Sequence, residues 1–216
     1  TPYHPSERTL SDATNWDLEV LTLLDDLGFS EVWIGQHFTV PWEPIPSPDL
    51  LIAQALLRTK QLRVGVGVHL LPFHHPVELA HRVAYLDHLA QGRLNVGIGA
   101  GVYPSDFRLF GSDTSAKQQR EMMEESVEII VRLWTEEQFQ YEGKYWNANK
   151  FEPMLDGLMQ HHIEPFQQPH PPIGIAGVTP GSTSLRLAGE RGFMPLSFAF
   201  TESYITNHWQ TIQAGA

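Results

Sequence analysis

Apolar positions along the chain follow two patterns that alternate. Short, nearly continuous apolar runs predict strands that are buried on both faces, as a parallel sheet requires; they lie at residues 31–34, 62–71, 94–98, 172–176 and 193–200. Between these runs, apolar residues recur at the spacing of a helical face, which predicts helices. The alternation predicts an α/β fold built on a parallel sheet.

The first helix is expected to start at Ser11 or Asp12, whose side chains can accept hydrogen bonds from its first N–H groups, and to end at Gly28. Its buried face should consist of apolar residues at helical spacing: Trp16, Val20, Leu23, Leu24 and Leu27. Two further helices should begin at Pro48 and Pro76. The remaining helices are expected at residues 117–134, 182–191 and 201–213.

Two architectures fit this alternation, the (β/α)8 or TIM barrel and the open doubly wound sheet. The segment Gly97-Ile-Gly-Ala-Gly101 partly matches a dinucleotide-binding fingerprint, but its third glycine comes one residue early and no helix is expected directly after it. We therefore expect the barrel.

A barrel of this type needs eight strands, and the chain offers the five runs plus the tail of a first strand at residues 1–3. We expect the barrel to be incomplete, without part of strand one and the last two βα units. Residues 1–216 should form a single domain, with an irregular insertion at residues 136–172.

Charge and composition narrow the function. The formal net charge is −11 with no basic cluster, which argues against a nucleic-acid or anionic-membrane partner. Cysteine is absent, which excludes disulfides and thiolate chemistry and fits a reduced compartment. No apolar run is long enough to span a membrane, and the first residues show no signal-peptide pattern. The cytoplasm is the predicted location.

Six segments together resemble one known family, in order and spacing: residues 33–37 (Trp-Ile-Gly-Gln-His), 42–48 (Trp-Glu-Pro-Ile-Pro-Ser-Pro), 70–76, 86–93, 97–104 and 186–192. The chain resembles the bacterial-luciferase-like flavin-dependent monooxygenases, most of all their limonene and diketocamphane monooxygenase types. The resemblance implies a TIM barrel whose enzyme uses reduced flavin and oxygen to oxygenate a small apolar molecule such as a terpene, a cyclic ketone or an aldehyde.

The resemblance also implies a site. His37 matches the family's active-site histidine, although Gln36 precedes it in place of an acidic residue and Phe38 replaces a second histidine. Gly67-Val68 matches a cis peptide bond beside the flavin ring. Residues along the ring and around the phosphate would be Gly99, Ala100, Tyr103, Arg120, Gly177, Ser182, Thr183 and Ser184.

Physical chemistry gives these residues the same roles. Catalytic groups of parallel barrels gather at the carboxyl ends of the strands. A helix that begins Ser-Thr-Ser offers free N–H groups and the positive end of its dipole to an anion, and an arginine adds paired hydrogen bonds. A substrate cavity is expected from residues that follow strands or lie in loops at this end: Phe38, Trp42, His69, Phe73 and Phe198.

Simpler interpretations compete with each assignment. The glycines could only shape turns, Ser182 to Ser184 could only cap a helix, and the aromatic residues could belong to the core. The pairs His74-His75 and His161-His162 suggest a metal, but adjacent residues of a strand face opposite sides and no carboxylate follows at ligand spacing. We expect no metal site.

If flavin binds, its reaction with oxygen gives a peroxide at the C4a carbon, and His37 hydrogen-bonds it or passes it a proton. The chain shows no nicotinamide fingerprint, so reduced FMN should come from a separate reductase; FAD is the alternative cofactor. A homodimer is expected. Two other functions stay open: a non-catalytic flavin-binding or stabilising relative, and a deazaflavin-dependent oxidoreductase of the same fold.

Overall fold

The computed structural model describes residues 3–5 and 7–216. Its centre is a parallel sheet in the order β1-β2-β3-β6-β7, formed by β1 (Glu31–Ile34), β2 (Arg63–Leu70), β3 (Leu94–Gly99), β6 (Ile173–Gly177) and β7 (Met194–Ser197). Each strand pairs with the one before it, so the order never reverses as it does in a doubly wound sheet. The sheet is a curled partial barrel wall, which confirms the predicted fold class.

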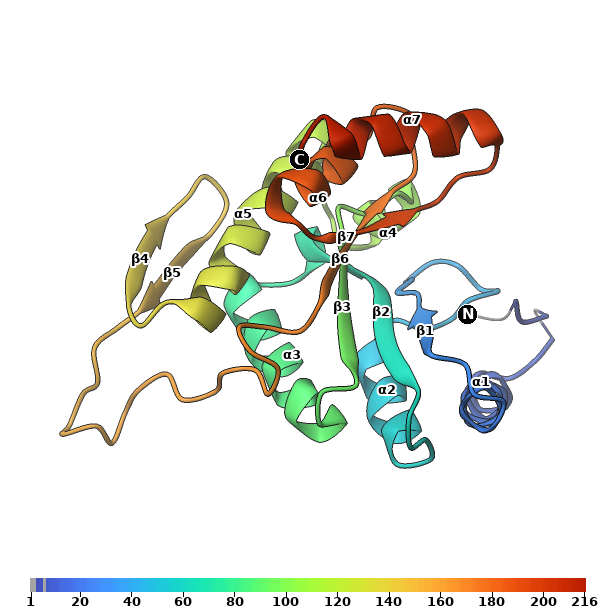
Figure 1. The fold of residues 1–216 in the computed structure, drawn as a ribbon, viewed down its shortest axis with the longest axis horizontal. Helices are drawn as coiled ribbons and strands as arrows, with labels where there is room; N and C mark the ends of the chain where they lie inside the picture. The colour runs from blue at the N-terminus through green and yellow to red at the C-terminus, as the bar shows by residue number, and fades with distance from the viewer. Residues whose placement is uncertain (1–2, 6) are drawn as a thin grey trace.

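Helices follow one another in an arc around the strands (Figure 1). They are α1 (Leu10–Asp26), α2 (Pro48–Leu56), α3 (Pro76–Ala90), α5 (Ala116–Thr135), α6 (Thr183–Arg191) and α7 (Glu202–Gln213). A 3-10 turn, η1 (Leu71–Phe73), and the short helix α4 (Pro104–Leu109) lie after β2 and β3. The apolar strand residues that face these helices are almost fully buried, and they form the main core.

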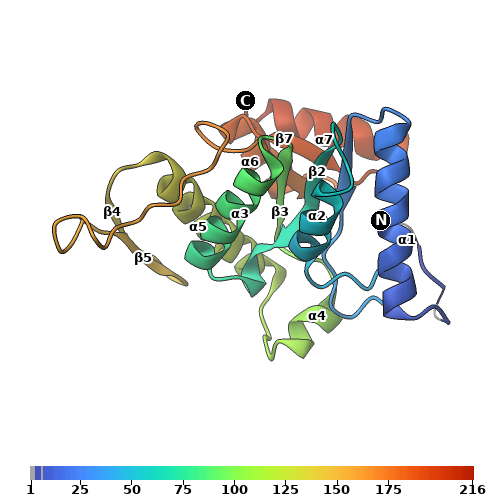
Figure 2. The ribbon, with the colours of Figure 1, turned by 90° about the horizontal axis from the view of Figure 1, so that it is seen from below.

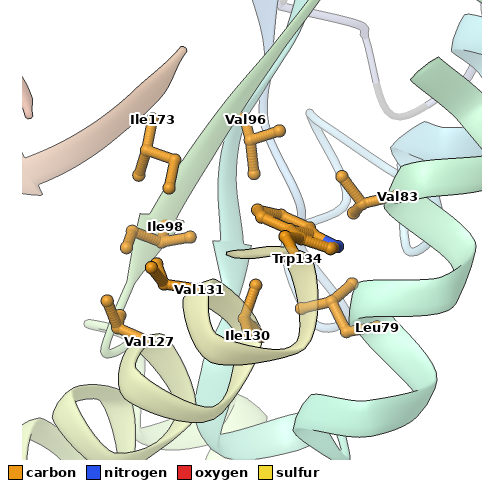
Figure 3. A pocket seen from close by; sticks show the side chains of 9 residues that line it. All are labelled: Leu79, Val83, Val96, Ile98, Val127, Ile130, Val131, Trp134 and Ile173. Carbon is orange, nitrogen blue, oxygen red and sulfur yellow. The ribbon is translucent and has the colours of Figure 1, made fainter. Parts of the chain in front are cut away.

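The core between the sheet and its helices keeps one small cavity of about 10 Å³. Figure 3 shows Val96 and Ile98 of β3 facing Trp134 of α5 and Leu79 of α3 across it. All of its lining side chains are apolar apart from the indole nitrogen of Trp134, which donates to the carbonyl of Ala80. The cavity is therefore a packing gap and not a candidate site.

On the opposite face of the sheet, glycines make room for one large side chain. A Cβ on Gly65 would come within 2.6 Å of Trp33, one on Gly67 within 2.9 Å, and one on Gly174 within 3.3 Å. The Trp33 indole thus lies against Gly65 and Gly67 of β2 and reaches Gly174 of β6, where a larger residue would crowd it. These three glycines serve packing inside the barrel wall.

The first helix begins and faces differently from the prediction. Thr9 is its N-cap, and the Thr9 hydroxyl accepts a hydrogen bond from the N–H of Asp12. The predicted caps Ser11 and Asp12 therefore lie within the first turn of the helix. Trp16, Leu23 and Leu27 are 46%, 54% and 64% exposed. The predicted buried face is therefore wrong for these three residues, whereas Val20 and Leu24 are partly buried and Leu24 packs against the core.

Two aspartates occupy the face of α1 that is buried instead, together with Ala13, Leu18 and Leu21. Asp17 pairs with the buried His4 (3.0 Å). Asp25 accepts three backbone N–H groups, from Lys60, Gln61 and Leu62, and these hydrogen bonds lower the pKa of its carboxyl despite the opposing effect of burial. Hydrogen bonds to the loop before β2 therefore decide that this face of α1 is buried, although its apolar spacing predicts another face.

Two more segments differ from expectation. The stretch expected to be irregular contains a hairpin of β4 (Phe139–Glu142) and β5 (Asn147–Lys150), set apart from the main sheet (Figure 2). Residues 1–2 of the predicted first-strand tail lie outside the described residues, and Tyr3 is not in a strand. Within the described part of the chain, no helix is both long and apolar enough to cross a membrane.

Candidate active site

The parallel strands bring the predicted site residues to one edge of the sheet. His37 follows β1 by three residues, and Gly99 and Gly177 are the last residues of β3 and β6. The peptide bond between Gly67 and Val68, in the second half of β2, is cis as expected. Since the carboxyl ends of parallel strands share one edge, all of these positions belong to the mouth of the barrel wall.

His37 has an acidic partner that the sequence analysis missed. Its Nε2 atom lies 3.0 Å from Oε2 of Glu43, with the two side chains 18% and 20% exposed. A carboxylate only accepts hydrogen bonds, so Nε2 carries the proton in this contact. Nδ1 is buried without a hydrogen-bond partner among the described residues, and the ring meets Tyr103 edge-on at 5.2 Å.

Gly35 makes room for this pair. A Cβ at Gly35 would come within 2.5 Å of Oε1 of Glu43 and within 3.3 Å of Nε2 of His37. A larger residue would therefore displace the carboxylate. The sequence did carry a sign of the pair, since Glu43 is the acidic residue closest to His37 in the proline-rich loop that follows β1.

Gln36 explains one departure from the family pattern. Its side chain is buried, and its Oε1 accepts from the N–H of Leu70 (2.9 Å) and from His74 (3.0 Å), while its Nε2 donates to the carbonyl of Pro46 (2.9 Å). A carboxylate could not make the last bond because it has no hydrogen to donate. We call His37, Glu43 and Gln36 the imidazole corner.

His69 does not line a substrate cavity, so that prediction is corrected. The side chain is 1% exposed and faces helix α2, with its Nε2 3.5 Å from Oδ1 of Asp49. Asp49 also accepts from Nε of Arg82 (2.7 Å). Burial lowers the pKa of His69, and burial together with the neighbouring His69 and Arg82 lowers the pKa of His74 to about 4.

A change of register explains the orientation of His69. Strict alternation would place it on the same face as Gly65 and Gly67. Between Val66 and His69, however, three residues of β2 pass two residues of β3 in the pairing. Val68 therefore turns toward the glycine face, where it lies against Gly97 and Gly99, and His69 turns toward the helices.

The other predicted cavity residues lie in three places. Phe38 and Phe73 meet at 5.6 Å, and both contact Phe110, so these two are brought together. Trp42 stacks on Tyr3 near the start of the chain. Phe198 is 62% exposed after β7, where it contacts Phe200.

Two glycines at and just after the end of β3 give close packing. A Cβ on Gly99 would come within 2.6 Å of Val68, and Gly101 has a φ of +86° that favours glycine. Ala100 is half-buried between them, and Tyr103 caps helix α4. The space beside Gly99 is filled by Val68, and the space beside Gly101 is filled by Phe107.

The turn into α6 is arranged as an anion site would be. Ser182 is the N-cap, and its hydroxyl accepts from the N–H of Leu185. The N–H groups of Thr183 and Ser184 have no acceptor within the helix, as is general for a first turn. Gly177 serves packing, because a Cβ there would come within 2.2 Å of Leu185. We call residues 178–184 the anion loop.

Arg120 lies at the level of the anion loop. Helices α5 and α6 run in the same direction because each returns from the carboxyl edge of the parallel sheet. Arg191 of α6 forms an ion pair with Glu128 of α5 (2.7 Å). Thr183 and Arg120 each stand eight residues earlier, so they lie at similar heights on the two helices.

Comparison with known proteins identifies the family. The family model described as luciferase-like monooxygenase matches residues 3–216. The chain belongs to the luciferase-like monooxygenases. The resemblance in the six segments is thereby confirmed.

Individual members of the luciferase-like family agree. The chain is 34% identical to 3,6-diketocamphane 1,6-monooxygenase of Pseudomonas putida over 100% of its own length and 61% of that protein, and 32% identical to limonene 1,2-monooxygenase of Rhodococcus erythropolis over 97% and 52%. The solved structure of the oxygenating constituent of 3,6-diketocamphane monooxygenase, in complex with FMN, superposes with a TM-score of 0.91 at 34% identity. That match covers 99% of this chain and 60% of the other, so the chain spans about half to three fifths of the length of these relatives.

The luciferase-like family supports the barrel fold, while the assignment of individual residues to flavin or substrate stays a prediction. Among the residues that the structure describes, no group of three or more histidine, aspartate and glutamate side chains is placed to hold a metal ion.

Proposed function

We propose that this protein is a flavin-dependent monooxygenase that uses reduced FMN and molecular oxygen to oxygenate a cyclic terpenoid ketone. The observation that carries the proposal is the imidazole corner at the carboxyl edge of the barrel wall. One nitrogen of its histidine binds a carboxylate, and the other is buried with no hydrogen-bond partner in the part of the chain that the structure describes. The 34% identity to a diketocamphane monooxygenase supports the substrate class.

The residues of the edge fit FMN at two points. The free N–H groups of Thr183 and Ser184, the hydroxyl groups of that turn and the guanidinium of Arg120 would hold the phosphate. The flat ring would lie beside Gly99, Ala100 and Tyr103, close to the Gly67–Val68 peptide. When bound, reduced flavin supplies the electrons that activate oxygen.

In this proposal, His37 holds or transfers a proton at Nδ1. Glu43 fixes the other nitrogen, so the ring cannot turn and Nδ1 keeps its direction. Phe38 and Phe73 form an apolar wall after β1 and β2 that excludes water and accepts an apolar substrate. One atom of O₂ would be inserted between the carbonyl carbon and its neighbouring carbon, which gives a lactone, and the other atom would leave as water with the two electrons that reduced FMN supplies.

A separate reductase would supply reduced FMN. The name of the superposed structure, an oxygenating constituent, supports a division of labour of this kind. FMN is proposed over FAD because that structure holds FMN. A homodimer and a cytoplasmic location remain predictions from the sequence.

The test uses full-length protein with chemically reduced FMN, ¹⁸O₂ and a camphor-type diketone, with product followed by mass spectrometry. We expect a lactone with one ¹⁸O atom, and a fall in turnover of about 10²–10⁴-fold in His37→Ala, the range for loss of a proton-transferring group. The matched control is His162→Ala, because His162 is exposed outside the site.

Three results would contradict the proposal. If FMN does not bind to full-length protein, the flavin assignment is wrong. If FMN binds but no substrate is oxygenated, a flavin-binding role without catalysis replaces it. If a deazaflavin binds in place of FMN, an oxidoreductase of the same fold replaces it.

A further inference from the structure

Two adjacent residues of helix α7 form hydrogen bonds with the backbone of the anion loop. The amide of Asn207 accepts from the backbone N–H of Gly181 through Oδ1 (2.5 Å). Next to it, Nε2 of His208 lies 3.0 Å from the carbonyl oxygen of Thr179. Two points of the loop, two residues apart, are thus fixed to one turn of α7.

The His208 ring ties the same loop to the last strand. Its Nδ1 lies 2.8 Å from the hydroxyl of Ser197, the final residue of β7. A carbonyl oxygen only accepts, so Nε2 carries the proton and donates to Thr179, and Nδ1 accepts from the Ser197 hydroxyl. The side chain is 1% exposed, and both of its nitrogens are satisfied.

Helix α7 is itself firmly placed on α6. A Cβ on Gly189 of α6 would come within 2.2 Å of the carbonyl oxygen of Ile212, and one on Gly215 would come within 2.2 Å of the carbonyl oxygen of Arg186. Glycine at these positions allows the two backbones to touch. The residues that hold the loop therefore stand on a rigid support.

These contacts occupy two of the N–H groups near the start of α6. The N–H of Gly181 is taken by Asn207, and the N–H of Leu185 is taken by Ser182. The N–H groups of Thr183 and Ser184 remain, and both belong to the first turn of α6. An anion would be bound by the helix terminus, with the preceding turn held still.

We infer that Asn207 and His208 are positioning residues that preset the anion loop for a phosphate monoester, so that they set the preference of the protein for FMN over riboflavin. The inference rests on the proposed function, because it takes the phosphate of FMN as the anion. It assigns a specificity role to α7, which lies outside the six family-like segments.

The test measures dissociation constants of full-length protein for FMN and for riboflavin by flavin fluorescence. Asn207→Ala should weaken FMN binding by about tenfold, the effect of one lost hydrogen bond of about 1.4 kcal/mol, and leave riboflavin binding within about twofold. His208→Leu should act in the same direction. His208→Gln should restore part of the preference, because its amide can donate to Thr179 and accept from Ser197. Thr206→Ala, an exposed neighbour on α7, is the control and should change neither constant.

A second readout separates this inference from the proposed function. Hydrogen exchange at Gly181 should accelerate in Asn207→Ala and not in Thr206→Ala, whether or not flavin binds. Unchanged exchange, or an equal loss of FMN and riboflavin affinity, would overturn the inference. If the wild-type protein binds neither flavin while hydrogen exchange responds as expected, the proposed function is wrong. In that case the result would still support the conclusion that α7 restrains the anion loop.

Discussion

The imidazole corner and the anion loop share one edge of the sheet, but they are built in different ways. In the imidazole corner, side chains bind other side chains and loops that follow consecutive strands, as Gln36 does with His74 and the Pro46 carbonyl. In the anion loop, the expected ligand groups are backbone N–H groups, and the support comes from a helix more than twenty residues downstream. The comparison indicates that chemistry and cofactor binding can be disrupted separately.

After His37 itself, Glu43 should give the largest effect, and the effect should be confined to turnover. Glu43→Ala removes the partner of His37 Nε2 and frees the ring, so we expect kcat to fall by about 10–100-fold, the usual cost of losing a group that orients a catalytic histidine. FMN affinity should change by less than about twofold, since the anion loop is untouched. Steady-state kinetics and flavin titration check both parts.

Two variants sharpen this result. Glu43→Gln keeps an acceptor for Nε2 without the charge, so near-normal turnover would assign the effect to orientation and low turnover would assign it to charge. Glu19→Gln, on the exposed surface of α1, is the control. Equal losses of turnover and FMN affinity in Glu43→Ala would contradict the separation of the two regions.

His74, which binds Gln36 of the imidazole corner, should make folding stability depend on pH. The pKa of His74 is lowered from 6.5 to about 4 in the folded protein. Between these two pH values the ring is neutral in the folded protein and protonated in the unfolded chain. The contribution of the neutral His74 ring to the free energy of unfolding is fully present above pH 6.5, and it is lost as the pH falls from 6.5 toward 4. Between pH 7.5 and pH 5 this amounts to about 2 kcal/mol.

Urea unfolding at the two pH values measures this loss in the wild type and in His74→Gln. The glutamine variant should lose about 2 kcal/mol less over the same interval, because its amide does not titrate. His75→Gln is the matched control, because His75 is exposed. An identical pH dependence in wild type and His74→Gln would show that this ring is not held neutral.

Arg120 should give the smallest effect, and it should appear only in cofactor binding. Arg120→Ala is expected to weaken FMN about tenfold, as for one lost charge-assisted pair of hydrogen bonds, with kcat at saturating FMN unchanged. Arg120→Lys should recover only part of the affinity, since an ammonium group lacks the planar fork. Lys117→Ala, one turn earlier and exposed, serves as the control. A loss of riboflavin affinity as large as that of FMN would place Arg120 outside the phosphate site.

Where the chain carries apolar runs on strands, prediction and structure agree closely. The run at residues 62–71 became β2 (Arg63–Leu70), and the helices predicted to begin at Pro48 and Pro76 do so. The first helix lies within about two residues of its predicted bounds, but three residues of its predicted buried face are exposed. Asp17 and Asp25 are buried instead, because their hydrogen-bond partners are distant in the sequence. The spacing of apolar residues along a helix carries no information about hydrogen bonds to segments that are distant in the sequence.

The sequence by itself determined the alternation of strands and helices, the edge at which His37 and the start of α6 stand, and the family. Tertiary structure alone decided that Glu43 reaches His37, that His69 turns to the helices, and that Asn207 and His208 hold the loop after β6. The physical reason is the difference in sequence separation between the two kinds of interaction. Apolar spacing and capping act within a few residues, whereas these contacts join segments that meet only after strand register and helix packing are fixed.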